Sequence, residues 1–159
     1  SQCTAELSSE QQKRAPRPYD GLMSEQTLIL VKPDGVKRGL VGEILRRIEA
    51  KGYRIEHMRM LTATDELLAK HYHEHTEKPF YTGMTDYMKS GPIVAAVIEG
   101  TRVIEGVRSL SGATEPTAAA PGTIRGDLGR DWGTGEIENL IHSSDGKDSA
   151  ALEISVWFD

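Results

Sequence analysis

The chain has 159 residues, of which 38% are hydrophobic and 27% are charged, and its formal net charge is -5. This length allows one domain with a proper core and leaves too little chain for two. The acidic balance argues against a non-specific nucleic-acid-binding protein, which usually has a basic surplus. The single cysteine, Cys3, excludes an intrachain disulfide, and no apolar run suits a membrane span or a signal peptide. We therefore expect a cytoplasmic protein without a membrane partner.

The first 22 residues are polar, contain Pro16 and Pro18, and show no apolar periodicity. Such segments rarely bury enough apolar surface to fold. We expect residues 1–22 to be a disordered leader or a cloning remnant, with Met23 as a candidate natural start. The functional domain is then residues 23–159.

Short apolar runs bounded by turn residues predict the strands. Residues 27–31 (TLILV) and 93–98 (IVAAVI) suit strands that are buried on both faces. The turn residues 32–35 (KPDG) end the first of these strands. Residues 53–61 are typical of another strand, and residues 139–158 of a short strand, a turn and a final helical segment.

Helices are predicted where apolar residues recur at helical spacing. The predicted helices cover residues 40–48 with a cap at Gly52, 64–71 with a cap at Thr64, 79–87 with Pro79 at the start, and 101–110. Residues 111–138 have weak periodicity and many glycines and prolines. A structureless stretch of this length inside a compact domain is usually functional.

The order is strand, helix, strand, a helical insert, strand, helix and a last strand. Four strands with two crossover helices predict an α/β (α+β) sandwich, in which a ferredoxin-like four-stranded antiparallel sheet is covered by helices. A fold of this kind does not by itself determine a function.

Several signatures of common sites are absent or incomplete. The sequence has no P-loop, no dinucleotide-binding glycine motif and no protein-kinase signature. On a helix, His71 and His75 of the HYHEH run would share one face, as zinc ligands can. Because no third ligand is evident, we interpret this run as a solvated polar helix face. His57, in a predicted strand, is interpreted as structural.

His142 follows an apolar pair and precedes serines and a carboxylate, so it is expected at the end of a strand. Taken alone, it is somewhat more typical of a structural histidine than of a nucleophile. Basic and amide side chains are expected around it, namely Lys32, Arg108, Arg125 and Asn139. Cations and amide donors around a neutral imidazole are what phosphoryl transfer to histidine requires.

The same residues lie in motifs that resemble the nucleoside diphosphate kinase family over nearly all of residues 26–159. The matching stretches are TLILVKPDGVKRGLVGEIL at 27–45, KPFY at 78–81, SGP at 90–92, PGTIRGD at 121–127, NLIHSSD at 139–145 and the SA..EI..WF pattern at 149–158. Several motifs in the right order are far more specific than any one of them.

The resemblance implies a ping-pong phosphotransferase with His142 as the nucleophile. A nucleoside triphosphate such as ATP would phosphorylate His142, and a nucleoside diphosphate would then collect the group. Glu153, with Ser144, would orient the imidazole, and Lys32 would lie near the transferring group. A carboxylate that fixes one imidazole tautomer is physically sensible.

The resemblance also implies a nucleotide site and a metal. The implied nucleotide-binding residues are Lys32, Tyr72, Phe80, Arg108, Thr114, Arg125 and Asn139. Phe80 would stack on the base, while Lys32 and Asn139 would bind the ribose hydroxyls. Mg²⁺ would bridge two phosphates, and Asp145 would help to hold the hydrated metal.

The sequence departs from the family pattern in three places. Ser143 stands where glycine is usual, and Gly146 where serine is usual. The segment between Arg125 and Asn139 is about four residues longer than in typical members, although extra loop length costs little stability. Ile137 or Trp132 would have to cover the second face of the base, so we expect altered nucleotide affinity.

Two other functions compete with an active kinase. The first is a catalytically weak family member that acts as a nucleotide-binding or regulatory module, but the presence of every expected site residue favours activity. The second, a nucleic-acid-binding regulator, is disfavoured by the acidic net charge. The resemblance further implies a homo-oligomer, a hexamer or a tetramer, with Pro116 in a loop that often makes subunit contacts.

Overall fold

The computed structural model describes residues 24–159, so the expectations for residues 1–22 and for Met23 lie outside the described residues. Within the described part, one antiparallel sheet has the strand order β2-β3-β1-β4. The strands are β1 (Ser24–Val31), β2 (Arg54–Leu61), β3 (Ile93–Thr101) and β4 (Ile141–Ser143). The predicted ferredoxin-like sheet is confirmed.

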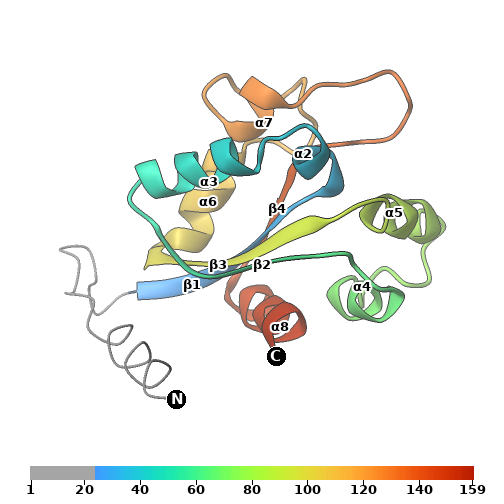
Figure 1. Ribbon diagram of the computed structural model, residues 1–159, viewed down its shortest axis with the longest axis horizontal. Helices are drawn as coiled ribbons and strands as arrows, with labels where there is room; N and C mark the ends of the chain where they lie inside the picture. Colours follow the sequence, from blue (N-terminus) through green and yellow to red (C-terminus); the bar gives the residue numbers. More distant parts are fainter. Residues whose placement is uncertain (1–23) are drawn as a thin grey trace, which may run out of the picture.

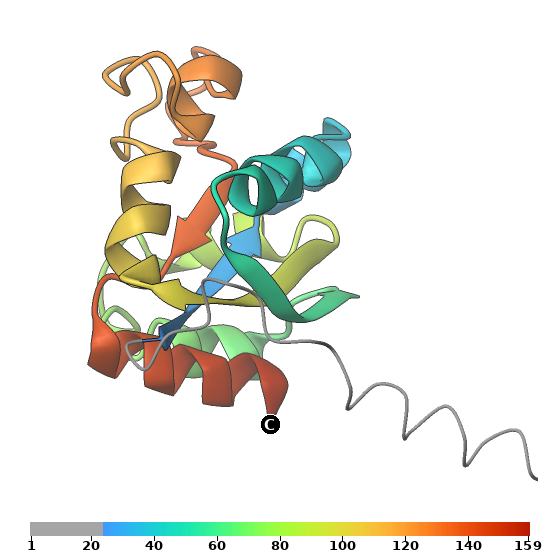
Figure 2. The same ribbon diagram turned by 90° about the vertical axis from the view of Figure 1, so that its left-hand side faces the viewer.

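Helices cover both faces of the sheet (Figures 1 and 2). One face carries α3 (Val41–Ala50) and α6 (Val103–Ser111). The other face carries α4 (Asp65–His71) and α8 (Lys147–Phe158), with α5 (Tyr81–Met88) beside them. In residues 24–159, no helix combines the length and the apolar character that crossing a membrane requires.

The central strand β1 divides the core into two layers. Ile29 and Val31 pack towards α3 and α6, whereas Leu28 and Leu30 pack towards α4 and α8. All four side chains are fully buried. Because successive side chains of a strand point to opposite faces, an uninterrupted apolar run fits a strand with helices on both sides.

The helix signals in the sequence mostly lie where the structure uses them. The Thr64 hydroxyl accepts a hydrogen bond from the Leu67 amide at 3.2 Å and caps α4. Gly52 follows α3 with φ of +103°, a conformation that favours glycine and ends the helix. Helix α5 begins at Tyr81, two residues after the predicted start at Pro79.

Two short helices were not predicted from the sequence. The KPDG run, expected as a turn, continues as α2 (Pro33–Lys37), with proline at the first helical position. The stretch 111–138, expected without regular structure, contains α7 (Ile124–Leu128). The Thr123 hydroxyl accepts a hydrogen bond from the Gly126 amide and caps α7.

Candidate active site

The predicted site residues meet at a cavity of about 610 Å³, which we call the His142 cavity. Among its lining residues are Lys32, Tyr72, Arg108, Thr114, Arg125, Asn139, His142, Asp145 and Glu153. Two predicted residues are not part of the lining. Ser144 is fully buried behind it, and Phe80 lies outside it.

The imidazole of His142 is held in one tautomer by Glu153. Strand β4 pairs His142 with Leu30 of β1, and α8 brings Glu153 to the same place. Nε2 of His142 lies 2.5 Å from Oε1 of Glu153, whose side chain is buried. A carboxylate accepts hydrogen bonds, so Nε2 carries the proton and Nδ1 keeps a free lone pair. Nδ1 has no hydrogen-bond partner among the described residues.

Ser144 fixes the carboxylate rather than the imidazole. Its hydroxyl donates to Oε1 of Glu153 at 3.1 Å and accepts from the Leu28 amide at 3.2 Å. This chain of bonds ties the Glu153 carboxylate to the backbone of β1. A hydrogen-bonded outer layer of this kind keeps the His142 imidazole in one orientation.

The HYHEH run does not form the solvated polar helix face that we expected. Helix α4 ends at His71, which is buried, and its ring packs edge-on against His142 with centroids 4.6 Å apart. Nδ1 of His71 accepts a hydrogen bond from the Trp157 indole at 3.0 Å. Burial, and then the proximity of His142, lower the His71 pKa to about 2, so the ring is neutral. Within the run, His73 and Glu74 match the expectation of full exposure, whereas Tyr72 and His75 are partly buried.

Lys32 and Asn139 form a pair on another wall of the His142 cavity. Nζ of Lys32 donates to Oδ1 of Asn139 at 2.8 Å, and the Asn139 amide donates to the Thr114 carbonyl at 2.9 Å. Burial lowers the Lys32 pKa to about 8, the charge of Arg125 adds to this effect, and Asp34 opposes it. Lys32 is therefore positively charged at neutral pH and loses its charge at mildly alkaline pH.

Arg125 is bound largely to the backbone. Its guanidinium donates to the carbonyls of Asn139 at 3.1 Å, Gly112 at 2.8 Å and Ile141 at 2.6 Å. An arginine has five N–H donors, so two remain for a ligand. Burial lowers the Arg125 pKa to about 10, and the charge of the neighbouring Arg108 contributes.

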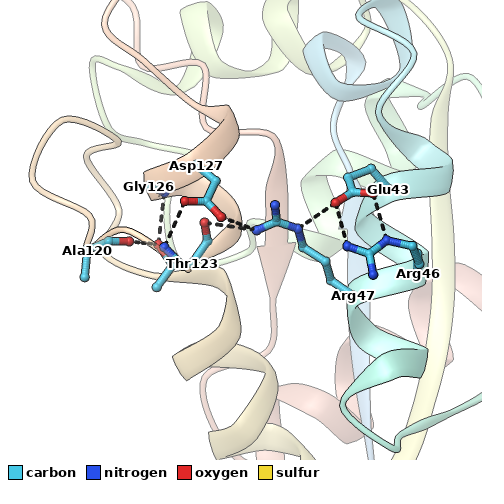
Figure 3. Close-up of polar contacts among 8 residues, drawn as sticks. Glu43, Arg46, Arg47, Ala120, Thr123, Gly126 and Asp127 are labelled. Carbon is cyan, nitrogen blue, oxygen red and sulfur yellow. Dashed lines mark hydrogen bonds and ion pairs between the residues drawn. The ribbon is translucent and has the colours of Figure 1, made fainter.

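A polar network joins α7, the helix that carries Arg125, to α3 (Figure 3). Nη1 of Arg47 donates to the Asp127 carboxylate at 2.7 Å, and its Nε donates to Glu43 at 3.0 Å. The Asp127 carboxylate also accepts a bond from the Gly122 amide at 2.8 Å. No motif pointed to this network, which holds α7 and therefore Arg125 in place.

Leu140, between Asn139 and Ile141, has a left-handed backbone with φ of +70°. This conformation costs a non-glycine residue on the order of 1 kcal/mol or more. The Leu140 amide donates to the Asp34 carboxylate at 3.1 Å, and its carbonyl accepts from the Lys32 amide at 2.8 Å. The Tyr87 hydroxyl also donates to Asp34. These bonds stabilise a turn that no motif in the sequence predicts.

Comparisons with known proteins agree on one family. The model of the family described as nucleoside diphosphate kinase matches residues 25–159. The chain is 53% identical to the nucleoside diphosphate kinase of Archaeoglobus fulgidus over 134 residues, which cover 84% of this chain and 86% of that protein. It is 53% identical to the one from Streptomyces avermitilis over 137 residues, covering 86% and 97% of the two chains. The chain belongs to the nucleoside diphosphate kinase family.

Solved structures of nucleoside diphosphate kinases share the fold. The Halobacterium salinarum enzyme in complex with CDP has a TM-score of 0.80 and 45% identity, covering 86% of this chain and 88% of that one. A transition state mimic of the Borrelia burgdorferi enzyme, with bound vanadate and ADP, has a TM-score of 0.80 and 36% identity. That match covers 87% of this chain and 89% of the other. The chain is thus an enzyme of the phosphotransferase class.

Trp132 and Ile137, expected to cover the second face of the base, do not line the His142 cavity. The Trp132 ring lies 4.5 Å from the Arg130 guanidinium and 5.3 Å from that of Arg38. It lines a second cavity of about 960 Å³ beside α2 and α5. Ile137 is exposed and lines a third cavity of about 330 Å³. Neither residue reaches the His142 cavity.

Phe80 is as exposed as a base platform must be. It immediately precedes α5, and 53% of its surface is accessible. The His75 ring, which lines the His142 cavity, lies 5.7 Å from the Phe80 ring. Phe80 is therefore next to the cavity without lining it.

The residues present fit a hydrated magnesium ion at one edge of the cavity. Asp145 is exposed there, and its carboxylate accepts a hydrogen bond from the Ser149 hydroxyl at 2.6 Å. Mg²⁺ prefers oxygen ligands and usually keeps several waters while binding one or two carboxylates and substrate phosphates. The lining also includes the exposed carboxylates of Glu74 and Asp148, and one or two such carboxylates suit this mode of binding.

Proposed function

We propose that the chain transfers the γ-phosphoryl group of a nucleoside triphosphate such as ATP to a nucleoside diphosphate through a phosphohistidine at His142. The observation that carries this proposal is the bond between Nε2 of His142 and Glu153. It leaves the Nδ1 lone pair as the nucleophile in a cavity that is also lined by Lys32, Arg108 and Arg125. A fixed imidazole among cations is the arrangement that phosphoryl transfer requires.

In the first step, the lone pair of Nδ1 attacks the γ-phosphorus. The bond from that phosphorus to the β–γ bridging oxygen breaks, and the diphosphate leaves with the electron pair. Nε2 keeps its proton, and the Glu153 carboxylate balances the positive charge that the ring acquires. The second step is the reverse reaction with a different diphosphate as the acceptor.

The cations neutralise charge that spreads over the phosphoryl oxygens. Arg108 is exposed at the cavity, and Arg125 retains two donors beyond its three backbone bonds. Thr114 and Tyr72 add hydroxyl groups to the lining. Lys32 and Asn139, which are hydrogen-bonded to each other, would bind ribose hydroxyls, and Lys32 would also bring positive charge to the transferring group.

Phe80 would provide a stacking surface for the base, which accepts every base because each has a π-face. Bound Mg²⁺ would screen the phosphate charge, and Asp145 would hold it through water. The complexes of related enzymes with CDP and with vanadate and ADP support nucleotide binding in this fold. We also propose that the protein is a cytoplasmic homo-oligomer. Sedimentation velocity would test the oligomeric state.

The experiment is to incubate the protein with γ-labelled ATP and Mg²⁺ in the absence of an acceptor. We expect an acid-labile phosphoenzyme that passes its label to added GDP, and no label on a His142→Ala variant. A His57→Ala variant is the matched control, because His57 is exposed on β2 and does not line the His142 cavity. An unlabelled wild type, or full labelling of His142→Ala, would contradict the mechanism.

A further inference from the structure

One face of α8 contacts both histidines of the site. Glu153 and Trp157 are four residues apart, so they lie on the same side of the helix. Glu153 bonds to His142, and Trp157 bonds to His71. The two contacts run in opposite directions, because a carboxylate accepts a hydrogen bond and an indole N–H donates one.

The indole N–H determines where the proton of His71 lies. The ring is neutral, so one nitrogen carries a hydrogen and the other has a free lone pair. Nδ1 accepts from the Trp157 indole at 3.0 Å, so the hydrogen is on Nε2. Both atoms of this hydrogen bond are buried, and solvent does not compete for it.

The same three side chains have the spacing of a metal site. One ligand atom each of His71, His142 and Glu153 lies within 4.8 Å of the other two. Two imidazoles and a carboxylate are also a ligand set of catalytic zinc sites, which leave a fourth position open. A cavity that admits nucleotides would admit zinc as well.

A zinc ion needs a lone pair from each imidazole, and His71 has none to offer. The lone pair of Nδ1 is bound to the indole N–H, and Nε2 carries the hydrogen. Moving that hydrogen to Nδ1 would set two N–H groups against each other in a buried contact. This holds whichever nitrogen of His71 faces the ion.

We propose that Trp157 is a positioning residue that acts through His71. By holding His71 in the Nε2-protonated tautomer, it leaves Nδ1 of His142 as the one basic nitrogen of the His71–His142–Glu153 cluster. The cluster therefore does not capture a soft divalent cation that would block the nucleophile. This inference deepens the proposed function and rests on it, because it takes His142 as the nucleophile.

The test compares zinc binding by the wild type and by a Trp157→Phe variant without nucleotide. Phenylalanine keeps an aromatic ring in the core but has no N–H donor. We expect Trp157→Phe to bind Zn²⁺ about tenfold more tightly by calorimetry, the change expected when one buried neutral hydrogen bond no longer opposes binding. Co²⁺ should give tetrahedral absorption bands in this variant and weak ones in the wild type.

A second variant separates the effect of the His71 tautomer on zinc affinity from an effect of altered packing. Adding His71→Gln to Trp157→Phe removes the third ligand, so the gain in Zn²⁺ affinity should disappear. Zinc should also inhibit phosphoenzyme formation by Trp157→Phe at about tenfold lower concentration than in the wild type, relative to each protein's own rate without zinc. Equal affinity of the wild type and Trp157→Phe would overturn the proposal.

A measurement on the wild type covers the case in which Trp157→Phe does not fold. Long-range ¹⁵N–¹H correlation spectra identify the protonated nitrogen of each histidine, and we expect His71 to carry its hydrogen on Nε2. A hydrogen on Nδ1 would overturn the proposal. The zinc-binding and spectroscopic measurements do not depend on catalytic turnover. If the wild type forms no phosphoenzyme, that result contradicts the proposed function, and these measurements still test the role of Trp157.

Discussion

The residues around His142 are held more firmly than the segments beside Phe80 and Trp132. Around His142, Glu153 and Ser144 are buried and bonded to partners on other elements. Phe80, by contrast, is 53% exposed, and residues 131–137 are all exposed. The Trp132 ring contacts the guanidinium of Arg38, which follows α2, and that of its near neighbour Arg130.

This difference matches what each part of a nucleotide requires. Phosphoryl transfer depends on a reacting atom held in line, where small displacements cost large factors in rate. Stacking on a base tolerates variation because it reads no hydrogen-bond pattern. A site that accepts several different bases therefore needs firmly held side chains around the phosphates. The side chains around the base can be held less firmly. Four changes test this comparison, from the largest expected effect to the smallest.

Replacing Glu153 by glutamine should have the largest effect. The side chain keeps its shape but loses the charge that balances the phosphorylated ring, so phosphoenzyme formation should slow roughly 10–100-fold. Single-turnover labelling with γ-labelled ATP measures this rate. Glu136→Gln on the exposed insertion is the matched control. A rate within twofold of the wild type would mean that the ordered region is not needed for chemistry.

Lys32 should produce a pH dependence on the alkaline side. Its pKa of about 8 means that it is charged below this pH and neutral above it. We expect kcat/KM to fall as pH rises through about 8, approaching tenfold per pH unit. Arginine stays charged over this range, so Lys32→Arg should lack the decline. Identical pH profiles of the two proteins would rule out Lys32 as its source.

Removing the Phe80 ring should affect binding rather than chemistry. Stacking of a base on an aromatic ring contributes about 1–3 kcal/mol, so Phe80→Ala should raise KM roughly tenfold or more. We expect similar factors for ADP and GDP and little change in kcat, while Phe80→Tyr should retain the wild-type KM. Steady-state kinetics with both acceptors measures these values. A loss confined to one base would show a selectivity that stacking alone does not supply.

Deleting residues 131–134 should have the smallest effect. Shortening an exposed loop and losing the two cation–π contacts of Trp132 should change the free energy of unfolding by about 2 kcal/mol or less. KM should change by less than about threefold, because Trp132 does not line the His142 cavity. Urea unfolding and steady-state kinetics measure the two quantities. A tenfold rise in KM would instead make the insertion part of the base site.

The sequence predicted the elements that carry their own periodic pattern. The apolar run 93–98 identified β3, and helical spacing identified α3, because burial on two faces or on one stripe leaves a regular signal. Helices α2 and α7 were missed because each is about one turn long and too short for an amphipathic pattern. Their stability depends on tertiary partners.

The sequence predicted those site residues that belong to recognisable motifs. The residues in KPDG, TIRGD and NLIHSSD meet as expected, but their connections were not evident. Trp157 bonds to His71 across 86 positions, and Arg47 bonds to Asp127 across 80. Such pairs join different elements, and a single sequence contains no local signal for them. The solvated interpretation of His71 failed for this reason.

The left-handed residue Leu140 has a consequence for which side chains can act together. In a regular strand, residues three apart point to opposite faces, so Asn139 and His142 would be separated by the sheet. Both line the same cavity, because the backbone reverses its alternation at Leu140. The proposed ribose ligand, Asn139, and the proposed nucleophile, His142, thus face the same cavity because of one reversal in the backbone. Asp34 accepts a hydrogen bond from the Leu140 amide and thereby stabilises this reversal, far from the phosphates it would help to bring into line with His142.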